Sequence, residues 1–157
     1  MPVYLRKVRR SRWLLDDALW VDGGDLQADA LQDLGTDGNA LSVWMVSDQP
    51  SLEQVLAAMA ANCDQITNFD YVTFSEESLQ SIEIVKCPGD TADGMANGCL
   101  HYHFAKLTAT RLVTVAKAGS FMRKHRKEVR DIVNRAIADG RISPSRLKPR
   151  VREYLGV

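Results

Sequence analysis

The sequence predicts an α/β fold: a small three- to four-stranded sheet with flanking helices and a basic helical C-terminal extension. Short apolar runs rich in β-branched and aromatic residues alternate along the chain with segments whose apolar residues recur at helical spacing. The order strand, helix, strand, short helix, strand, long helix is typical of α/β domains. With 157 residues, 45% of them hydrophobic and 25% charged, the chain corresponds to about one globular domain.

Three apolar segments predict the strands of the sheet. Residues 41–46 give the clearest pattern, because the run is short, apolar and β-branched and ends at a polar stretch before Pro50. Residues 70–74 and 82–87 follow the same pattern more weakly. Three strands are few for a stable sheet, so a fourth is expected from residues 2–8.

The predicted helices are placed by their apolar spacing and their end signals. Asp25 can cap the first, and Ser51 with Gln54 forms a capping box for the second. Gly119 separates the longest helix from the next one. In chain order, we expect helices at residues 25–34, 51–62, 76–81, 100–118, 121–138 and 145–155.

The chain is expected to form one structural unit with two parts, a compact α/β domain at residues 1–118 and a basic helical extension at 119–157. Its apolar runs are far shorter than the roughly 20 residues of a membrane span, and its N-terminus lacks the pattern of a signal peptide. The chain has three cysteines, a low and odd number that does not suit a disulfide framework. We therefore expect a cytoplasmic protein without a membrane partner or a cofactor.

Charge is distributed very unevenly along the sequence. Residues 13–105 hold 16 Asp and Glu but only one basic side chain, Lys86, which gives this part a charge of −15. The two ends hold the other 19 Lys and Arg with four acids, a charge of +15, so the net charge is zero. Such a charge asymmetry bears on which partners a protein binds rather than on its fold.

A basic cluster in the C-terminal segment is the first candidate site. Its charges cover most of the polar side of a predicted helix, which suits the phosphate backbone of a nucleic acid. Two alternatives stay open: the helix can lie against the acidic part of its own chain, or it can bind an acidic protein. No known nucleic-acid-binding module is recognisable. The candidate residues are Arg123, Lys124, Arg126, Lys127, Arg130 and Arg135.

Cys99, His101 and His103 form a second candidate, a metal site, with Cys87 one loop upstream. If this segment is extended, the three side chains share one face and can hold zinc, because side chains alternate along a strand. If it is helical, the two histidines point about 200° apart and cannot chelate together. The apolar spacing over 100–118 favours a helix, so we expect no bound metal here.

Three carboxylates form a third candidate. Asp48 follows a predicted strand, while Asp90 and Asp93 lie in a Gly-rich loop at 88–98. Around a shared Mg²⁺ they would suit phosphodiester hydrolysis, provided that they lie within a few ångströms of one another. The loop lacks the P-loop and dinucleotide-binding patterns, and turn and capping preferences alone explain Asp and Gly there.

These features favour a small, non-catalytic cytoplasmic binding protein, an accessory or regulatory subunit with a protein as its partner. A component of a toxin–antitoxin or defence-type system would fit this size and this lack of catalytic motifs. The first alternative is a nucleic-acid-binding module that uses the basic C-terminal helix. The second is a Mg²⁺-dependent phosphodiesterase or nuclease. Whether the chain forms a homo-oligomer stays open.

Overall fold

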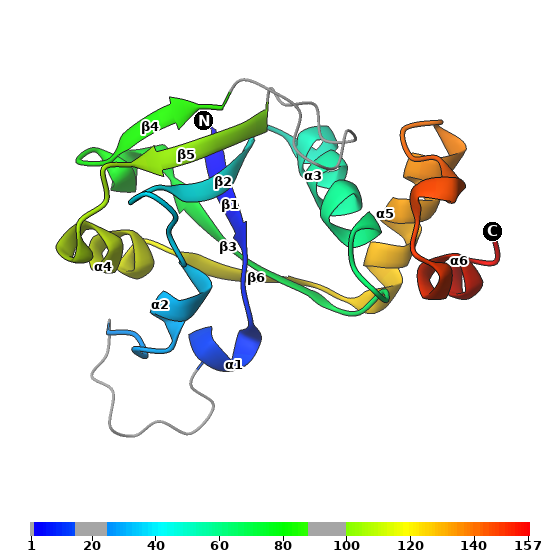
Figure 1. Cartoon of the computed structure of the whole chain (residues 1–157), viewed down its shortest axis with the longest axis horizontal. Helices are drawn as coiled ribbons and strands as arrows, with labels where there is room; N and C mark the ends of the chain where they lie inside the picture. Colours follow the sequence, from blue (N-terminus) through cyan, green and yellow to red (C-terminus); the bar gives the residue numbers. More distant parts are fainter. Residues whose placement is uncertain (1, 15–24, 88–99) are drawn as a thin grey trace.

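The computed structural model, which describes residues 2–14, 25–87 and 100–157, contains a six-stranded sheet. The strand order is β4-β5-β2-β1-β3-β6, and every neighbouring pair is antiparallel (Figure 1). The α/β class is confirmed, but the expectation of three to four strands is wrong. The strands are β1 (Val3–Lys7), β2 (Leu41–Val46), β3 (Phe69–Ser75), β4 (Glu83–Lys86), β5 (His101–Ala105) and β6 (Ser120–Lys124).

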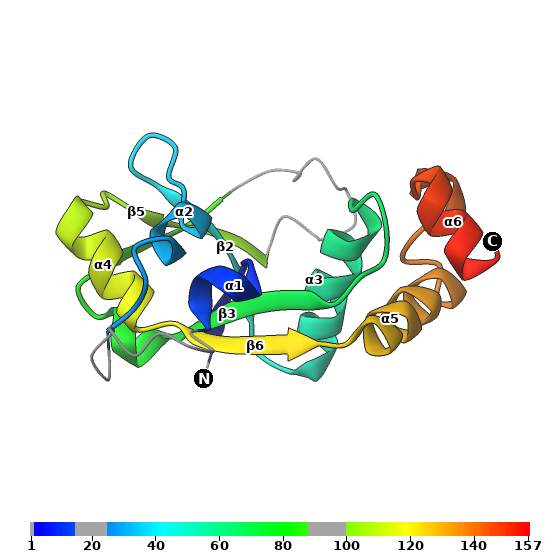
Figure 2. The same ribbon diagram turned by 90° about the horizontal axis from the view of Figure 1, so that it is seen from below.

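The helices are distributed along the long axis of the molecule (Figure 1). In both views α4 lies toward one end and α5 and α6 toward the other, while α1 and α3 lie nearer the middle (Figure 1, Figure 2). Among the described residues, no helix is long and apolar enough to cross a membrane. The helices are α1 (Arg10–Trp13), α2 (Ala30–Asp33), α3 (Gln49–Ala61), α4 (Ala109–Lys117), α5 (Arg126–Ala138) and α6 (Pro149–Leu155), with single 3₁₀ turns η1 (Glu76–Leu79) and η3 (Pro144–Arg146).

Each face of the sheet has its own apolar core, because successive side chains of a strand point to opposite faces. Leu5 of β1 belongs to the core that α3, α5 and α6 cover, while its neighbour Tyr4 belongs to the core under α2 and α4. Trp44 and Val43 of β2 divide in the same way. The sheet is therefore the middle layer of the molecule.

The predicted helix at 100–118 is wrong in its first part, which is strand β5. Tyr102 and Phe104 point to one face, where their ring centroids lie 5.8 and 5.4 Å from that of Tyr4. Lys106 then adopts a positive φ of 54°, which ends the strand before α4. The apolar residues that suggested one helix are thus shared between a strand and the helix after it.

The helix expected at 121–138 also begins later, because residues 120–124 form the edge strand β6. The C-terminal extension is therefore not wholly helical. Helix α5 begins at Arg126, whose N–H donates to the side chain of Asn68 at 2.9 Å. The N–H of the N-cap residue His125 donates to Glu128 at 2.8 Å, so two of the N–H groups at the start of α5 have side-chain partners.

The remaining sequence predictions are largely confirmed. Strands appear close to all four predicted positions, and α3 occupies the predicted second helix. Its cap is Asp48 rather than Ser51: Asp48 accepts from the Ser51 N–H at 2.8 Å, while the Asp48 N–H lies 3.1 Å from the Ser51 hydroxyl. The predicted helix at 25–34 is reduced to the single turn α2, and that at 145–155 divides into η3 and α6.

Candidate functional site

Antiparallel pairing brings the two basic ends of the sequence to one end of the sheet. Lys7, the last residue of β1, pairs with Tyr71, and Lys124, the last residue of β6, pairs with Phe69. Both strands therefore end beside the start of β3. The chain continues from β1 into α1 and from β6 into α5 (Figure 1).

We call this region the cationic end and define it as residues 6–12 and 123–128 with the two acids that bond to them, Asp33 and Asp70. The two segments hold nine Lys and Arg. Three carboxylates, those of Asp33, Asp70 and Glu128, oppose them. An excess of six positive charges remains in one small part of the surface.

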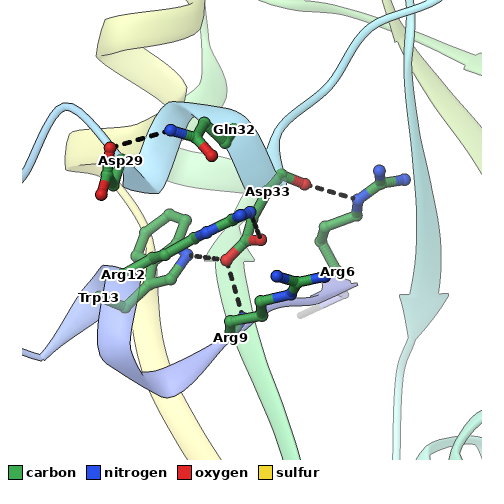
Figure 3. A network of polar contacts seen from close by, with 7 residues as sticks. All are labelled: Arg6, Arg9, Arg12, Trp13, Asp29, Gln32 and Asp33. Atoms are coloured by element: carbon green, nitrogen blue, oxygen red, sulfur yellow. Dashed lines mark hydrogen bonds and ion pairs between the residues drawn. The ribbon is translucent and has the colours of Figure 1, made fainter.

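Asp33 of α2 fixes the N-terminal half of the cationic end (Figure 3). Its carboxylate accepts the Arg9 backbone N–H at 2.7 Å, the Arg12 guanidinium at 2.7 Å and the Trp13 indole N–H at 3.1 Å. Its backbone carbonyl accepts from Arg6 at 3.2 Å. These bonds hold the short helix α1 against α2.

An open pocket of about 420 Å³ lies in the cationic end, between the N-terminal basic segment and the start of β3. Lys7, Arg9 and Arg10 line it together with Asn68 and Asp70. Asn68 also accepts the first N–H of α5, so this pocket lies next to the start of the basic helix. The cations that line the pocket come from the N-terminal segment, and the C-terminal basic segment begins beside it at Asn68.

Two of the six basic residues that the sequence nominated are paired with carboxylates from the acidic middle of the chain. Arg123 makes a two-pronged contact with Asp70 at 2.6 and 2.9 Å. Arg135 contacts Glu53 of α3 at 3.0 Å. For these two residues, docking against the protein's own acidic part is what the structure shows.

Two further nominated residues pair with acids of the C-terminal segment itself. Lys124 lies 3.3 Å from Glu128, and Arg130 lies 3.4 Å from Asp131. The hydrogen bond from the His125 N–H lowers the pKa of the Glu128 carboxyl group most, and the contact with Lys124 lowers it further. Exposed ion pairs at this distance contribute little free energy, so Lys124 and Arg130 can leave their partners at low cost.

The last two nominated residues face solvent at the start of α5. The Arg126 guanidinium lies over the ring of Tyr154 in α6, 4.1 Å from its centroid, and Lys127 is exposed. The basic cluster is therefore only partly neutralised by the acidic middle. The candidate residues named from the sequence do not include the N-terminal half of the cationic end, Lys7 to Arg10. The concentration of basic residues in the first 12 positions of the sequence indicates this half.

Of the three carboxylates proposed as a Mg²⁺ site, only Asp48 lies among the described residues. Asp48 is the N-cap of α3, and hydrogen bonds from Ser51 lower the pKa of its carboxyl group. A capping role thus accounts for its position. Asp90 and Asp93 lie outside the described residues, so the shared Mg²⁺ site stays a prediction.

The histidines lie on a strand, the alternative that the sequence interpretation did not favour. His101 and His103 share one face of β5, with ring centroids 5.1 Å apart. Cys87, which follows β4, joins them, and one ligand atom from each of the three lies within 4.8 Å of the others. Cys99 lies outside the described residues. The sequence placed Cys87 nearby, but only the pairing of β4 with β5 shows that it faces the histidines.

Comparisons with protein-family models, with curated proteins and with solved structures found no match for this chain. The features of this chain that indicate a function are therefore the cationic end and the cluster of Cys87, His101 and His103.

Proposed function

We propose that this protein is a non-catalytic binding protein whose cationic end holds the phosphate backbone of a nucleic acid. The observation that supports the proposal is that both basic segments meet beside the start of β3, with an excess of six positive charges there and an open pocket lined by the N-terminal cations. Lysine and arginine that neutralise phosphates release condensed counterions, and this release provides sequence-independent affinity.

The acidic part of the chain argues against such a ligand only if it lies close to the bound phosphates. The acids Asp48, Glu76 and Glu77 follow β2 and β3, at the end of the sheet where β1 begins. A five-residue strand spans about 17 Å. The Debye length is about 10 Å at 0.1 M salt, so these acids are largely screened from a ligand at the cationic end.

Arginine at the cationic end suits phosphate, because a guanidinium offers two parallel donors to an oxyanion. Contacts to phosphate carry no sequence information, so binding is expected to be independent of sequence. An accessory or regulatory role in the cytoplasm belongs to the same proposal. Cys63 and Cys87 are free thiols, which agrees with a reducing compartment.

The test is a salt titration. Fluorescence anisotropy measures the binding of the whole chain to a labelled mixed-sequence RNA and to a DNA duplex at a series of salt concentrations. With four to six phosphates contacted, the logarithm of the binding constant should fall with log salt at a slope of about −3 to −5. Absent binding at low salt, or a flat salt dependence, contradicts the proposal.

A matched pair of double variants locates the site. Arg9→Gln with Lys127→Gln removes two charges from the cationic end, and we expect about a tenfold loss of affinity and a slope shallower by about two. Lys106→Gln with Arg111→Gln removes two charges near the start of α4, and affinity should change less than about twofold. Equal effects would disprove the location. Binding to polyglutamate but not to nucleic acid would replace the ligand with an acidic protein.

A further inference from the structure

The pairing of β4 with β5 places three metal-ligating side chains on one face of the sheet. Val85 is the register partner of His103 and Lys86 that of Tyr102, and the Cys87 N–H donates to the His101 carbonyl at 3.0 Å. Cys87 and His101 are therefore directly opposite each other. His103 is two residues along β5 and points to the same face.

The distances between these side chains fit a single small cation. One ligand atom from each lies within 4.8 Å of the other two. Zinc bonds of 2.0 to 2.3 Å at tetrahedral angles put neighbouring donor atoms about 3.5 Å apart. The ligand atoms must therefore approach one another by about 1 Å. Rotation of the side chains is enough for this, because all three side chains already point to the same face.

The surroundings of His101 hold its ring in place. The Ser42 hydroxyl lies 2.9 Å from Nε2 of His101, and the centroid of the Trp44 ring lies 5.0 Å from that of the His101 ring. Metal-bound imidazoles are commonly oriented by a hydrogen bond to a second group. Cys87, His101 and His103 are all half-buried, so a cation can reach them while part of its hydration shell is displaced.

A cysteine nucleophile is a weaker interpretation of the same cluster. A thiol nucleophile needs one neighbouring base, whereas here two imidazoles and a thiol converge on one point. When a cation binds, the thiol loses its proton to solvent as the metal–sulfur bond forms. The convergence of three donor groups is thus better explained by a metal than by a nucleophile.

We infer that Cys87, His101 and His103 form a zinc site with three protein ligands and water in the fourth position. One thiolate and two imidazoles are donors that zinc prefers, and three protein ligands with one open position is an arrangement known from zinc proteins. The site lies on β4 and β5, whereas the cationic end lies on β1, β3 and β6. It is therefore independent of the proposed nucleic-acid site.

The experiment uses the untagged full chain, freed of metal by a chelator and titrated with Co²⁺ and then with Zn²⁺. A tetrahedral Co²⁺ site with a thiolate ligand gives visible d–d bands and a near-ultraviolet sulfur-to-metal band. We expect one equivalent of Co²⁺ to produce both and one equivalent of Zn²⁺ to abolish them. Calorimetry with Zn²⁺ gives the affinity.

Variants identify the ligands. Cys87→Ser should remove the sulfur-to-metal band and weaken Zn²⁺ binding at least 100-fold, and His103→Gln should weaken it as strongly while keeping the band. Ser42→Ala should cost about tenfold or more in affinity through the freed His101 ring. Cys63→Ser is the matched control, because it removes the other free thiol among the described residues and should change nothing.

Circular dichroism confirms that each variant is folded before its titration. Lack of Co²⁺ and Zn²⁺ binding by the folded wild-type chain at 100 μM metal would overturn the inference. Loss of the sulfur-to-metal band in Cys63→Ser or Cys99→Ser, with retention in Cys87→Ser, would overturn the ligand assignment.

Discussion

The carboxylate of Asp33 should be among the most costly charged groups to remove from this protein. It is only 7% exposed and accepts three hydrogen bonds, from the Arg9 N–H, the Arg12 guanidinium and the Trp13 indole (Figure 3). All three donors belong to the segment that forms α1. The Arg12 side chain is 22% exposed, so this pair is more shielded from water than the other ion pairs described.

In Asp33→Ala the Arg12 charge and the indole N–H lose their partner while they stay partly buried. Removing one member of a buried ion pair costs about 3 kcal/mol or more, and the residual exposure of Arg12 places this case near the lower value. For a chain of this size, that loss corresponds to a fall in Tm of about 6 to 12 °C. Urea unfolding at pH 7, followed by circular dichroism, measures the free energy directly.

Asp29→Ala is the matched control, because Asp29 lies next to the same helix and its side chain bonds only to the exposed Gln32 amide at 2.9 Å (Figure 3). We expect that variant to lie within about 0.5 kcal/mol of the wild type. If Asp33→Ala costs less than about 1 kcal/mol, or no more than Asp29→Ala, then the three bonds do not hold α1 in place.

Two further predictions concern packing and pH. A Cβ at Gly119 would meet an aromatic carbon at 3.1 Å and a backbone carbonyl at 3.2 Å, so Gly119→Ala should cost about 1 to 2 kcal/mol in urea unfolding, whereas Gly35→Ala, whose nearest neighbour is 3.7 Å away, should not destabilise. Hydrogen bonds from Gln49 and then Arg135 lower the pKa of Glu53 below its usual 4.5. The ionised Glu53 carboxylate therefore contributes its full stability above that value, and this contribution is lost as the pH falls through the lower native pKa. The stability difference between wild type and Glu53→Gln should be constant from about pH 7 to 5 and should shrink towards about pH 3.

How far the sequence predicts this fold depends on which interactions decide each element. Residues 41–46 and 51–62 carry local signals, a β-branched apolar run and a capping pattern, and both elements appear where expected. Residues 101–105 and 120–124 have no such signal. They become strands because β2 and β3 offer free edges to pair with, and a contact between distant segments is not visible in local spacing.

The candidate sites show the same limit. The sequence named His101 and His103 and stated that an extended segment would let them share a face, but it could not select that conformation. Cys87 was noticed as a neighbour along the chain, yet its place opposite His101 follows from the register of β4 and β5. Spacing can thus propose ligands, whereas pairing decides which of them meet.

The sheet keeps part of the unequal charge distribution in space, although six ion pairs between described residues join a basic end of the sequence to its acidic middle. Strands β1 and β6 run parallel to each other, since both are antiparallel to β3, and both carry basic residues at their last two positions and beyond. Strands β2 and β3 run the other way and are followed by Asp48 and Glu76. Had β6 paired in the opposite direction, its basic residues would lie beside those acids and be neutralised. The direction of one edge strand therefore determines whether the C-terminal cations join those of the N-terminal segment in binding a polyanion.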